Sequence, residues 1–129
     1  MDKNIFYNAP FDGNGKEGRG PGESLNKGID LNEQLVTNKP ATFFLRVNSE
    51  AMAGAGIRKG DVVIVDRSLE PRNGKIVIAV ADGEMLIRRL EVTGGRKRLV
   101  APGSGLSSLE LADGYITCWG VVTYVIHHV

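Results

Sequence analysis

Apolar and polar residues alternate over short runs from Thr42 to the end of the chain, a pattern typical of β-strands that are buried on one face. Six runs are predicted as strands: 43–47, 62–66, 75–81, 84–92, 98–101 and 115–127. Two dipeptides that accept positive φ angles, Asn73-Gly74 and Asp82-Gly83, are expected to form tight hairpins. The pattern predicts a mainly β fold of curved, hairpin-linked sheets with a short helix.

The first 28 residues differ from the rest of the chain. Half of the residues from Gly13 to Gly22 are glycine, so this stretch is costly to order and has little apolar area to bury. We predict a flexible glycine-rich arm over residues 1–28 and one folded domain over residues 29–129. The domain is expected to open with a short helix over residues 30–36, capped by Asp30.

The composition of the chain restricts which classes of protein it can belong to. The chain has 129 residues, 42% hydrophobic and 24% charged, which is ordinary for one globular domain. Its formal net charge of +1 gives no support for direct DNA binding through bulk electrostatics. Cys118 is the single cysteine, which excludes an internal disulfide, and no Cys/His metal spacing is present. Without an apolar signal core or a membrane-length segment, we expect a cytoplasmic protein that needs no cofactor.

The run from Phe43 to Asp66 joins a strand, a turn of small residues and a second strand. It closely resembles the nucleophile segment of the LexA/UmuD family of self-cleaving serine peptidases. In that family the nucleophilic serine stands just before the methionine, at the position that Ala51 holds here. Ser49, Glu50 and Met52 are the other residues of this predicted nucleophile turn.

A second match concerns the family's lysine base. The base lies on a later strand, in a run that resembles residues 84–90, and Arg88 holds its position, 37 residues after Ala51. The resemblance is closest to UmuD and extends from Ile29 to the C-terminus, including Gly120-Val121-Val122 in the last strand. It implies a LexA/UmuD peptidase-like fold.

The residues at these two positions do not make a Ser–Lys dyad, which needs a hydroxyl and a neutral amine within hydrogen-bond reach. Ala51 has no hydroxyl, and the guanidinium of Arg88 stays protonated, so it cannot take a proton. The arm also lacks the Ala-Gly or Cys-Gly bond that the resemblance would place near Gly15. We interpret the chain as a pseudo-peptidase.

Arg88 is expected to have a structural role. On an alternating strand it shares a face with Leu86 and Leu90, and a guanidinium among apolar side chains needs hydrogen-bond acceptors. The candidate acceptors are backbone carbonyls and the carboxylates of Glu50, Asp82 and Glu84.

Three other features carry less weight. The glycines from Gly13 to Gly18 fit the pattern G-x-G-x-x-G, but no predicted strand precedes them and no helix follows, so the nucleotide-binding geometry is missing. His127 and His128 are adjacent on a strand, point to opposite faces and are expected to be exposed. Ser49 lies two residues before Ala51 with no base in evidence, and we interpret it as a turn or strand hydroxyl.

The resemblance implies a function in binding. A non-cleaving UmuD-like protein would act as a dimeric accessory subunit of an error-prone translesion polymerase in the SOS response. Its expected partners are a second copy and a Y-family DNA polymerase or other replication protein, with a recombinase filament as a further candidate. Two alternatives stay open: a family peptidase inactivated by mutation, and a decoy that regulates an active relative through mixed dimers.

The last predicted strand is apolar on both faces, and a symmetric dimer would bury the surplus. Strict alternation assigns its side chains to two sets: Tyr115, Trp119, Val121 and Val125 on one face, and Ile116, Cys118, Val122, Tyr124 and Ile126 on the other. We take it as an end strand with a free edge, which invites pairing with another chain. The predicted dimer contacts are Trp119, Val122, Tyr124 and Ile126.

Overall fold

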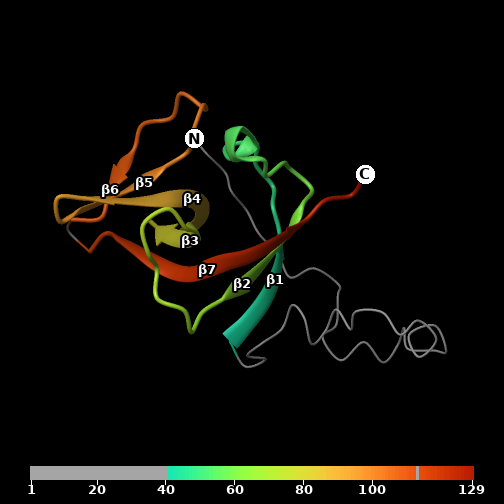
Figure 1. Cartoon of the computed structure of the whole chain (residues 1–129), viewed down its shortest axis with the longest axis horizontal. Coiled ribbons are helices and arrows are strands. Elements are labelled where there is room, and N and C mark those ends of the chain that lie inside the picture. The colour runs from blue at the N-terminus through green and yellow to red at the C-terminus, as the bar shows by residue number, and fades with distance from the viewer. Residues whose placement is uncertain (1–40, 113) are drawn as a thin grey trace.

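The computed structural model describes residues 41–112 and 114–129 (Figure 1). Its elements, in chain order, are β1 Thr42–Arg46, the 3-10 helix η3 Ala53–Ala55, β2 Val62–Asp66, β3 Ile76–Ala81, β4 Glu84–Thr93, β5 Arg96–Val100, β6 Leu109–Glu110 and β7 Ile116–Ile126. All six predicted strands are present, with bounds that agree or differ by at most two residues, and the short β6 was not predicted. The predicted arm and the helix over residues 30–36 lie outside the described residues.

The strands form one antiparallel sheet in the order β1-β2-β7-β3-β4-β5-β6, so the last strand of the chain is central. Residues 121–126 of β7 pair with β2, and residues 116–121 pair with β3 on the other side. Figure 1 shows β7 crossing from the side of β3 and β4 to the side of β1 and β2. The prediction of an end strand with a free edge is wrong, because two distant strands each pair with part of β7.

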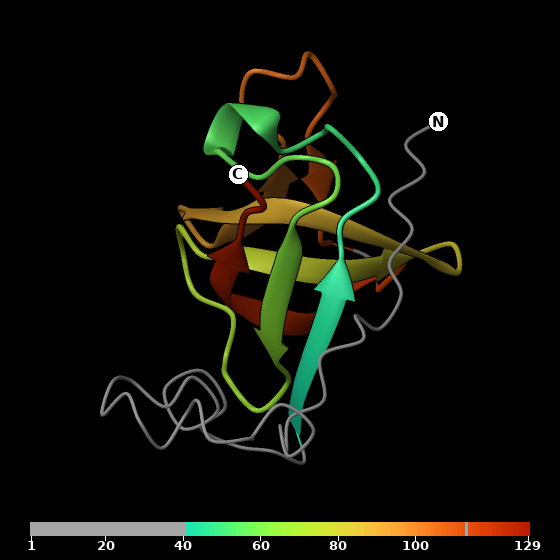
Figure 2. The ribbon, with the colours of Figure 1, turned by 90° about the vertical axis from the view of Figure 1, so that its right-hand side faces the viewer.

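The sheet bends along β7. In Figure 2, β1 and the antiparallel β2 lie nearly upright while β3 and β4 run across them, and β7 curves from one direction into the other. The pairing of β7 with β3 skips Trp119, and its pairing with β2 skips Thr123. Such bulges bend a strand and increase its twist, so they account for the curvature that the sequence predicted.

The two bulges also change which side chains of β7 share a face. Cys118 and Val121 pack with one core cluster, whereas Trp119, Val122 and Val125 pack with the other. The prediction from strict alternation, which grouped Trp119 with Val121 and Cys118 with Val122, is wrong. Each bulge adds one residue and reverses the phase of the side chains beyond it.

The core lies on both faces of β3 and β4. Ile78 and Ile87, which are paired across these strands, belong to the larger cluster, and Val77 and Leu90 belong to the smaller one. None of the four exposes more than 1% of its surface. Since burial of one such side chain is worth about 1.5–3 kcal/mol, these central strands anchor the domain.

Two-residue turns close the β3–β4 and β4–β5 hairpins. Asp82 and Gly83 have φ angles of 52° and 76°, which confirms the hairpin predicted there. The dipeptide Gly94-Gly95 makes the second turn. Asn73-Gly74 also forms a turn, but the predicted hairpin is wrong at this point, because β7 lies between β2 and β3.

Candidate functional site

The turn that contains Ala51 links β1 to β2 and tightens into η3. Within it, the Ala53 N–H donates to the Glu50 carbonyl at 3.0 Å. Gly56 ends the turn at φ 88°, a left-handed conformation that glycine adopts without steric cost. The small side chains predicted a turn or a single helical turn here, and this is confirmed.

The four residues of the predicted nucleophile turn have structural contacts. Ala51 and Met52 are buried in the larger core cluster, with 9% and 0% of their surfaces exposed. The hydroxyl oxygen of Ser49 accepts a hydrogen bond from the Ala51 N–H at 3.0 Å, a local bond that stabilises turns. The carboxylate of Glu50 lies at the surface, 3.5 Å from Arg58.

This turn packs against the loop that follows β5. Ala101 belongs to the same buried cluster as Ala51. A Cβ atom at Gly54 would overlap the carbonyl oxygen of Pro102, so the close approach of the two backbones requires glycine. The loop then continues to Leu106, which lines a pocket next to β4.

Arg88 lies on β4 with only 3% of its surface exposed. Leu86 and Leu90 are buried on the same face of the strand, as the alternation predicted. Nη1 of Arg88 donates a hydrogen bond to the Ile87 carbonyl at 2.8 Å, so a backbone carbonyl is confirmed as one of its acceptors. Burial and this bond support the structural role expected for Arg88.

Arg88 also lines a pocket of about 670 Å³, the Arg88 pocket. The β3–β4 hairpin, the segment around β6 and the start of β7 contribute its walls. The lining residues are Ala81, Asp82, Glu84, Leu86, Arg88, Leu106, Ser107, Leu109, Tyr115 and Ile116. Asp82 and Glu84, two predicted acceptors, therefore share the pocket with Arg88. Sequence reasoning missed the pocket itself, because its walls come from segments that are far apart along the chain.

Ala51 does not line the Arg88 pocket. It packs in the cluster that contains Ile87, the neighbour of Arg88 on β4. Ala51 has no hydroxyl and Arg88 has no lone pair to accept a proton. As they stand, these two positions offer neither a nucleophile nor a general base.

Comparison with known proteins establishes the family. The peptidase S24-like family matches residues 15–123 of this protein, and this range is well over half of the chain. The chain belongs to this family. The LexA/UmuD-like character predicted from the sequence is therefore confirmed, and the seven-stranded antiparallel sheet is consistent with the expected peptidase S24-like fold.

Several peptidase S24-like relatives share much of the sequence. Protein ImpA of Salmonella typhimurium is 40% identical over 99 residues, which cover 77% of this chain and 68% of ImpA. Protein SamA of Salmonella typhimurium strain LT2 is 33% identical over 99 residues, with 77% and 69% covered. LexA repressor 1 of Xanthomonas campestris pv. campestris is 40% identical over 76 residues, which are 59% of this chain and 37% of the repressor.

The four predicted dimer contacts of this peptidase S24-like chain differ in their surroundings. The Trp119 ring packs on the Phe43 ring, and their centroids are 5.1 Å apart. The guanidinium carbon of Arg67 lies over the Trp119 ring, 4.3 Å from its centroid. Val122 packs against the larger core cluster. Tyr124 and Ile126 remain 40% and 44% exposed. Trp119 and Val122 thus have partners within their own chain, and the two exposed residues are the better candidates for an interface.

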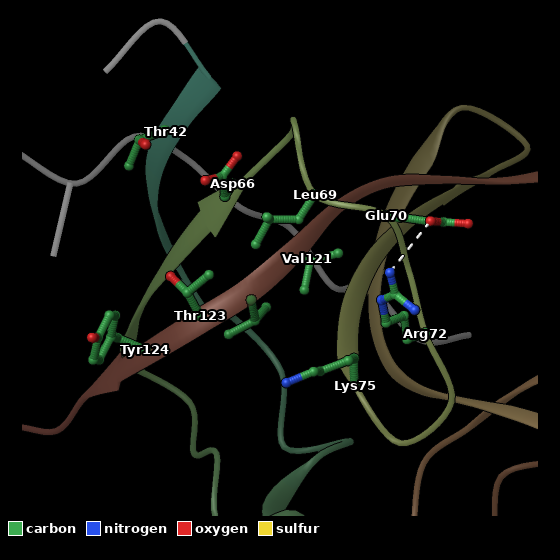
Figure 3. Close-up of a pocket in the computed structure, with 10 residues that line it drawn as sticks. Thr42, Asp66, Leu69, Glu70, Arg72, Lys75, Val121, Thr123 and Tyr124 are labelled. Carbon is green, nitrogen blue, oxygen red and sulfur yellow. Dashed lines mark ion pairs between the residues drawn. The ribbon is translucent and has the colours of Figure 1, made fainter. Parts of the chain in front are cut away.

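A second pocket, of about 580 Å³, lies where β7 passes the segment between β2 and β3 (Figure 3). Its lining residues are Thr42, Asp66, Leu69, Glu70, Arg72, Lys75, Val121, Val122, Thr123 and Tyr124, none of which lines the Arg88 pocket. Glu70 and Arg72 form an exposed ion pair at 3.7 Å, which solvent screens. This pocket contains neither Ala51 nor Arg88.

Two structural findings concern membrane insertion and metal binding. In the part of the chain that the structure describes, no helix is long and apolar enough to cross a membrane. Across residues 41–112 and 114–129, no three His, Cys, Asp or Glu side chains group as metal ligands would.

Proposed function

We propose that this chain is a non-cleaving UmuD-like protein that acts as a dimeric accessory subunit of an error-prone translesion DNA polymerase in the SOS response. The observation that carries the proposal is the pair of residues at the expected dyad positions, Ala51 and Arg88. Membership of the peptidase S24-like family and the similarity to ImpA and SamA support the UmuD-like part.

The chemistry of the two positions supports the non-cleaving part. Self-cleavage needs an oxygen nucleophile, and Ala51 presents a methyl group that is almost fully buried. It also needs an amine that can be neutral near physiological pH, and arginine stays protonated even where burial would neutralise a lysine. The protein is therefore a pseudo-peptidase, and its function lies in binding.

The surface of β7 supports a dimer. Tyr124 and Ile126 expose large apolar or aromatic groups close together near the end of the strand. A symmetric dimer would remove both from water on both subunits. The polymerase partner, of the Y family, or another replication protein would bind this dimer, and a recombinase filament is a further candidate partner.

Two measurements test the proposal. The purified chain is incubated with an activated recombinase filament and, separately, at alkaline pH, and we expect mass spectrometry to show one unchanged mass. A pull-down from DNA-damaged cells is expected to retain a Y-family polymerase. Clean self-proteolysis would refute the pseudo-peptidase assignment, and a pull-down without any replication protein would refute the accessory role.

A further inference from the structure

We infer that Arg67, together with the rings of Trp119 and Phe43, binds an acidic side chain of a partner protein that is flanked by an apolar residue. These three residues, here called the Arg67 surface, line neither of the two pockets described above. The inference rests on the proposed function in one respect: the chain acts by binding another protein. It adds the chemistry that this partner presents and the place where it is bound.

Three contacts hold the Arg67 side chain in place. Its Nε–H donates a hydrogen bond to the Trp119 carbonyl at 2.9 Å. The guanidinium carbon lies 4.3 Å from the centroid of the Trp119 ring, a distance at which the ring face attracts a cation. The stem lies close to Gly120, since a Cβ atom added there would be 3.5 Å from Cγ of Arg67. The guanidinium is therefore oriented before any ligand binds, which lowers the entropic cost of binding.

The pairing of β7 explains why a side chain takes the Trp119 carbonyl. The β2–β7 ladder ends at the pair of Asp66 and Val121, and Arg67 is the first residue after β2. On the other side of β7, the pairing with β3 skips Trp119. Trp119 is thus paired in neither ladder, and its carbonyl accepts the Nε–H of Arg67.

The N–H groups on both Nη atoms of Arg67 have no acceptor among the described residues. The two carboxylates nearest to Arg67 in the sequence have other contacts. Asp66 accepts a hydrogen bond from the Ser68 N–H at 2.8 Å, and Glu70 lies 3.7 Å from Arg72 (Figure 3). A guanidinium without a carboxylate partner in its own chain is available to a carboxylate of another protein.

The unoccupied edge of this guanidinium matches a carboxylate. Arginine presents its N–H groups in one plane, and the two oxygens of an Asp or Glu side chain can accept two of them in parallel. Because Nε already donates to Trp119, the carboxylate would approach the edge formed by Nη1 and Nη2. Such a bidentate pair fixes the orientation of the ligand as well as its charge.

Trp119 and Phe43 supply the apolar part of the surface. Their ring centroids are 5.1 Å apart, with the planes tilted by 58°, and both residues are only partly buried against the larger core cluster. A large apolar side chain next to the acid on the partner would cover ring surface that water contacts now. Tryptophan and arginine are also enriched among the residues that contribute most to protein–protein affinity.

The charge of the surface favours a protein over a nucleic acid. Proteins that bind nucleic acids neutralise several phosphates with several cations, and the Arg67 surface has one cation. The formal net charge of the whole chain is only +1. A single oriented guanidinium beside two rings suits one carboxylate with an apolar neighbour.

The fluorescence of Trp119 tests the inference, because it is the only tryptophan of the chain. The full chain is titrated with two terminally blocked tripeptides without aromatic residues, leucine-glutamate-leucine and leucine-glutamine-leucine. We expect the glutamate probe to change the emission in a saturable way and to bind about three-fold or more tightly, the effect of one exposed ion pair. High salt should reduce this difference. Equal affinity for the two probes at low salt overturns the inference.

Three variants assign the effect to Arg67 and keep Trp119 as the reporter. Arg67 is exposed, so Arg67→Gln is expected to fold and should bind the two probes equally. Arg67→Lys should lose most of the preference, because an ammonium has no planar fork. Arg72→Gln, at a second exposed arginine, is the matched control and should keep the preference. A preference for glutamate that survives in Arg67→Gln, or that Arg72→Gln also removes, overturns the inference.

Two further measurements address other occupants of the Arg67 surface. A short oligothymidylate should bind more weakly than the glutamate probe, and tighter binding would assign the surface to nucleic acid and overturn the inference. Sedimentation of Arg67→Gln should give the same mass as the parent chain, and a lower mass would assign the surface to a second copy and overturn it. Each of these failures leaves the proposed function standing, because that function is tested by self-cleavage and partner capture.

Discussion

The Nδ1 atom of His127 lies 2.7 Å from Oδ2 of Asp61, which joins the end of β7 to the segment that follows the Ala51 turn. Asp61 is nearly buried, and the same carboxylate oxygen accepts a hydrogen bond from the Arg58 N–H at 2.8 Å. The side chain of His127 is half-exposed, so solvent partly screens this contact. It fixes the last residues of β7 relative to the candidate site.

Loss of this contact should lower stability. His127→Ala is expected to reduce the free energy of unfolding by about 0.5–1 kcal/mol, because a half-exposed pair is partly screened by solvent. His128→Ala, one residue further along, is the control and should have no measurable effect. Thermal denaturation of both variants checks the prediction, and equal melting temperatures would show that the contact contributes nothing.

Restoring the dyad residues should not restore self-cleavage. Ala51→Ser or Arg88→Lys alone is expected to recover almost nothing, because dyad members act as a unit. The double variant should still leave its own chain intact, since the arm has no Ala-Gly or Cys-Gly bond. It is expected to cut a family-type peptide slowly in trans. Mass spectrometry of the chain and the peptide distinguishes these cases, and cleavage within the arm would contradict the prediction.

Gly54→Ala should destabilise the domain. The added Cβ would overlap the Pro102 carbonyl oxygen, so the turn and the loop after β5 would have to separate. Overpacking of this kind costs about 1–3 kcal/mol. Ala53→Gly, at the exposed neighbouring position, is the control and should cost less. Urea denaturation measures both changes, and a Gly54→Ala variant as stable as the parent would show that the two backbones separate freely.

The chain should be a dimer at micromolar concentration. Ile126→Asp and Tyr124→Asp are expected to weaken the dimer without abolishing the fold, because both side chains are partly exposed. Leu106→Asp, equally exposed at 44% but in the Arg88 pocket, is the matched control for Ile126. Sedimentation gives the mass directly, and a 13.9 kDa monomer at high concentration would exclude the dimer.

Cys118 should react slowly with alkylating reagents near neutral pH. Burial raises the pKa of its thiol above the ordinary value of 9.0, and the positive charge of Lys97 only partly offsets this. Less thiolate is then present than in an exposed cysteine, so the rate should rise only as the pH passes above that value. The urea-unfolded chain is the control. Equal rates for the folded and unfolded chain would contradict the prediction.

Local sequence was sufficient for the strands and for the burial of Arg88 on β4. Alternation located all six long strands, and it placed Arg88 on one face with Leu86 and Leu90, where it is buried. Asp82-Gly83 formed the expected hairpin because its backbone preferences are set by those two residues alone. Each of these features depends on residues that are near neighbours in the chain.

Tertiary structure alone decided the place and phase of β7. Its pattern could not show that β2 and β3 pair on its two sides, because strand pairing depends on contacts between distant residues. The bulges at Trp119 and Thr123 follow from that pairing, as does the hydrogen bond from Arg67 Nε to the Trp119 carbonyl, which spans 52 residues. A hydrophobic pattern determines which face of a segment is buried, whereas tertiary packing determines which distant segments cover that face.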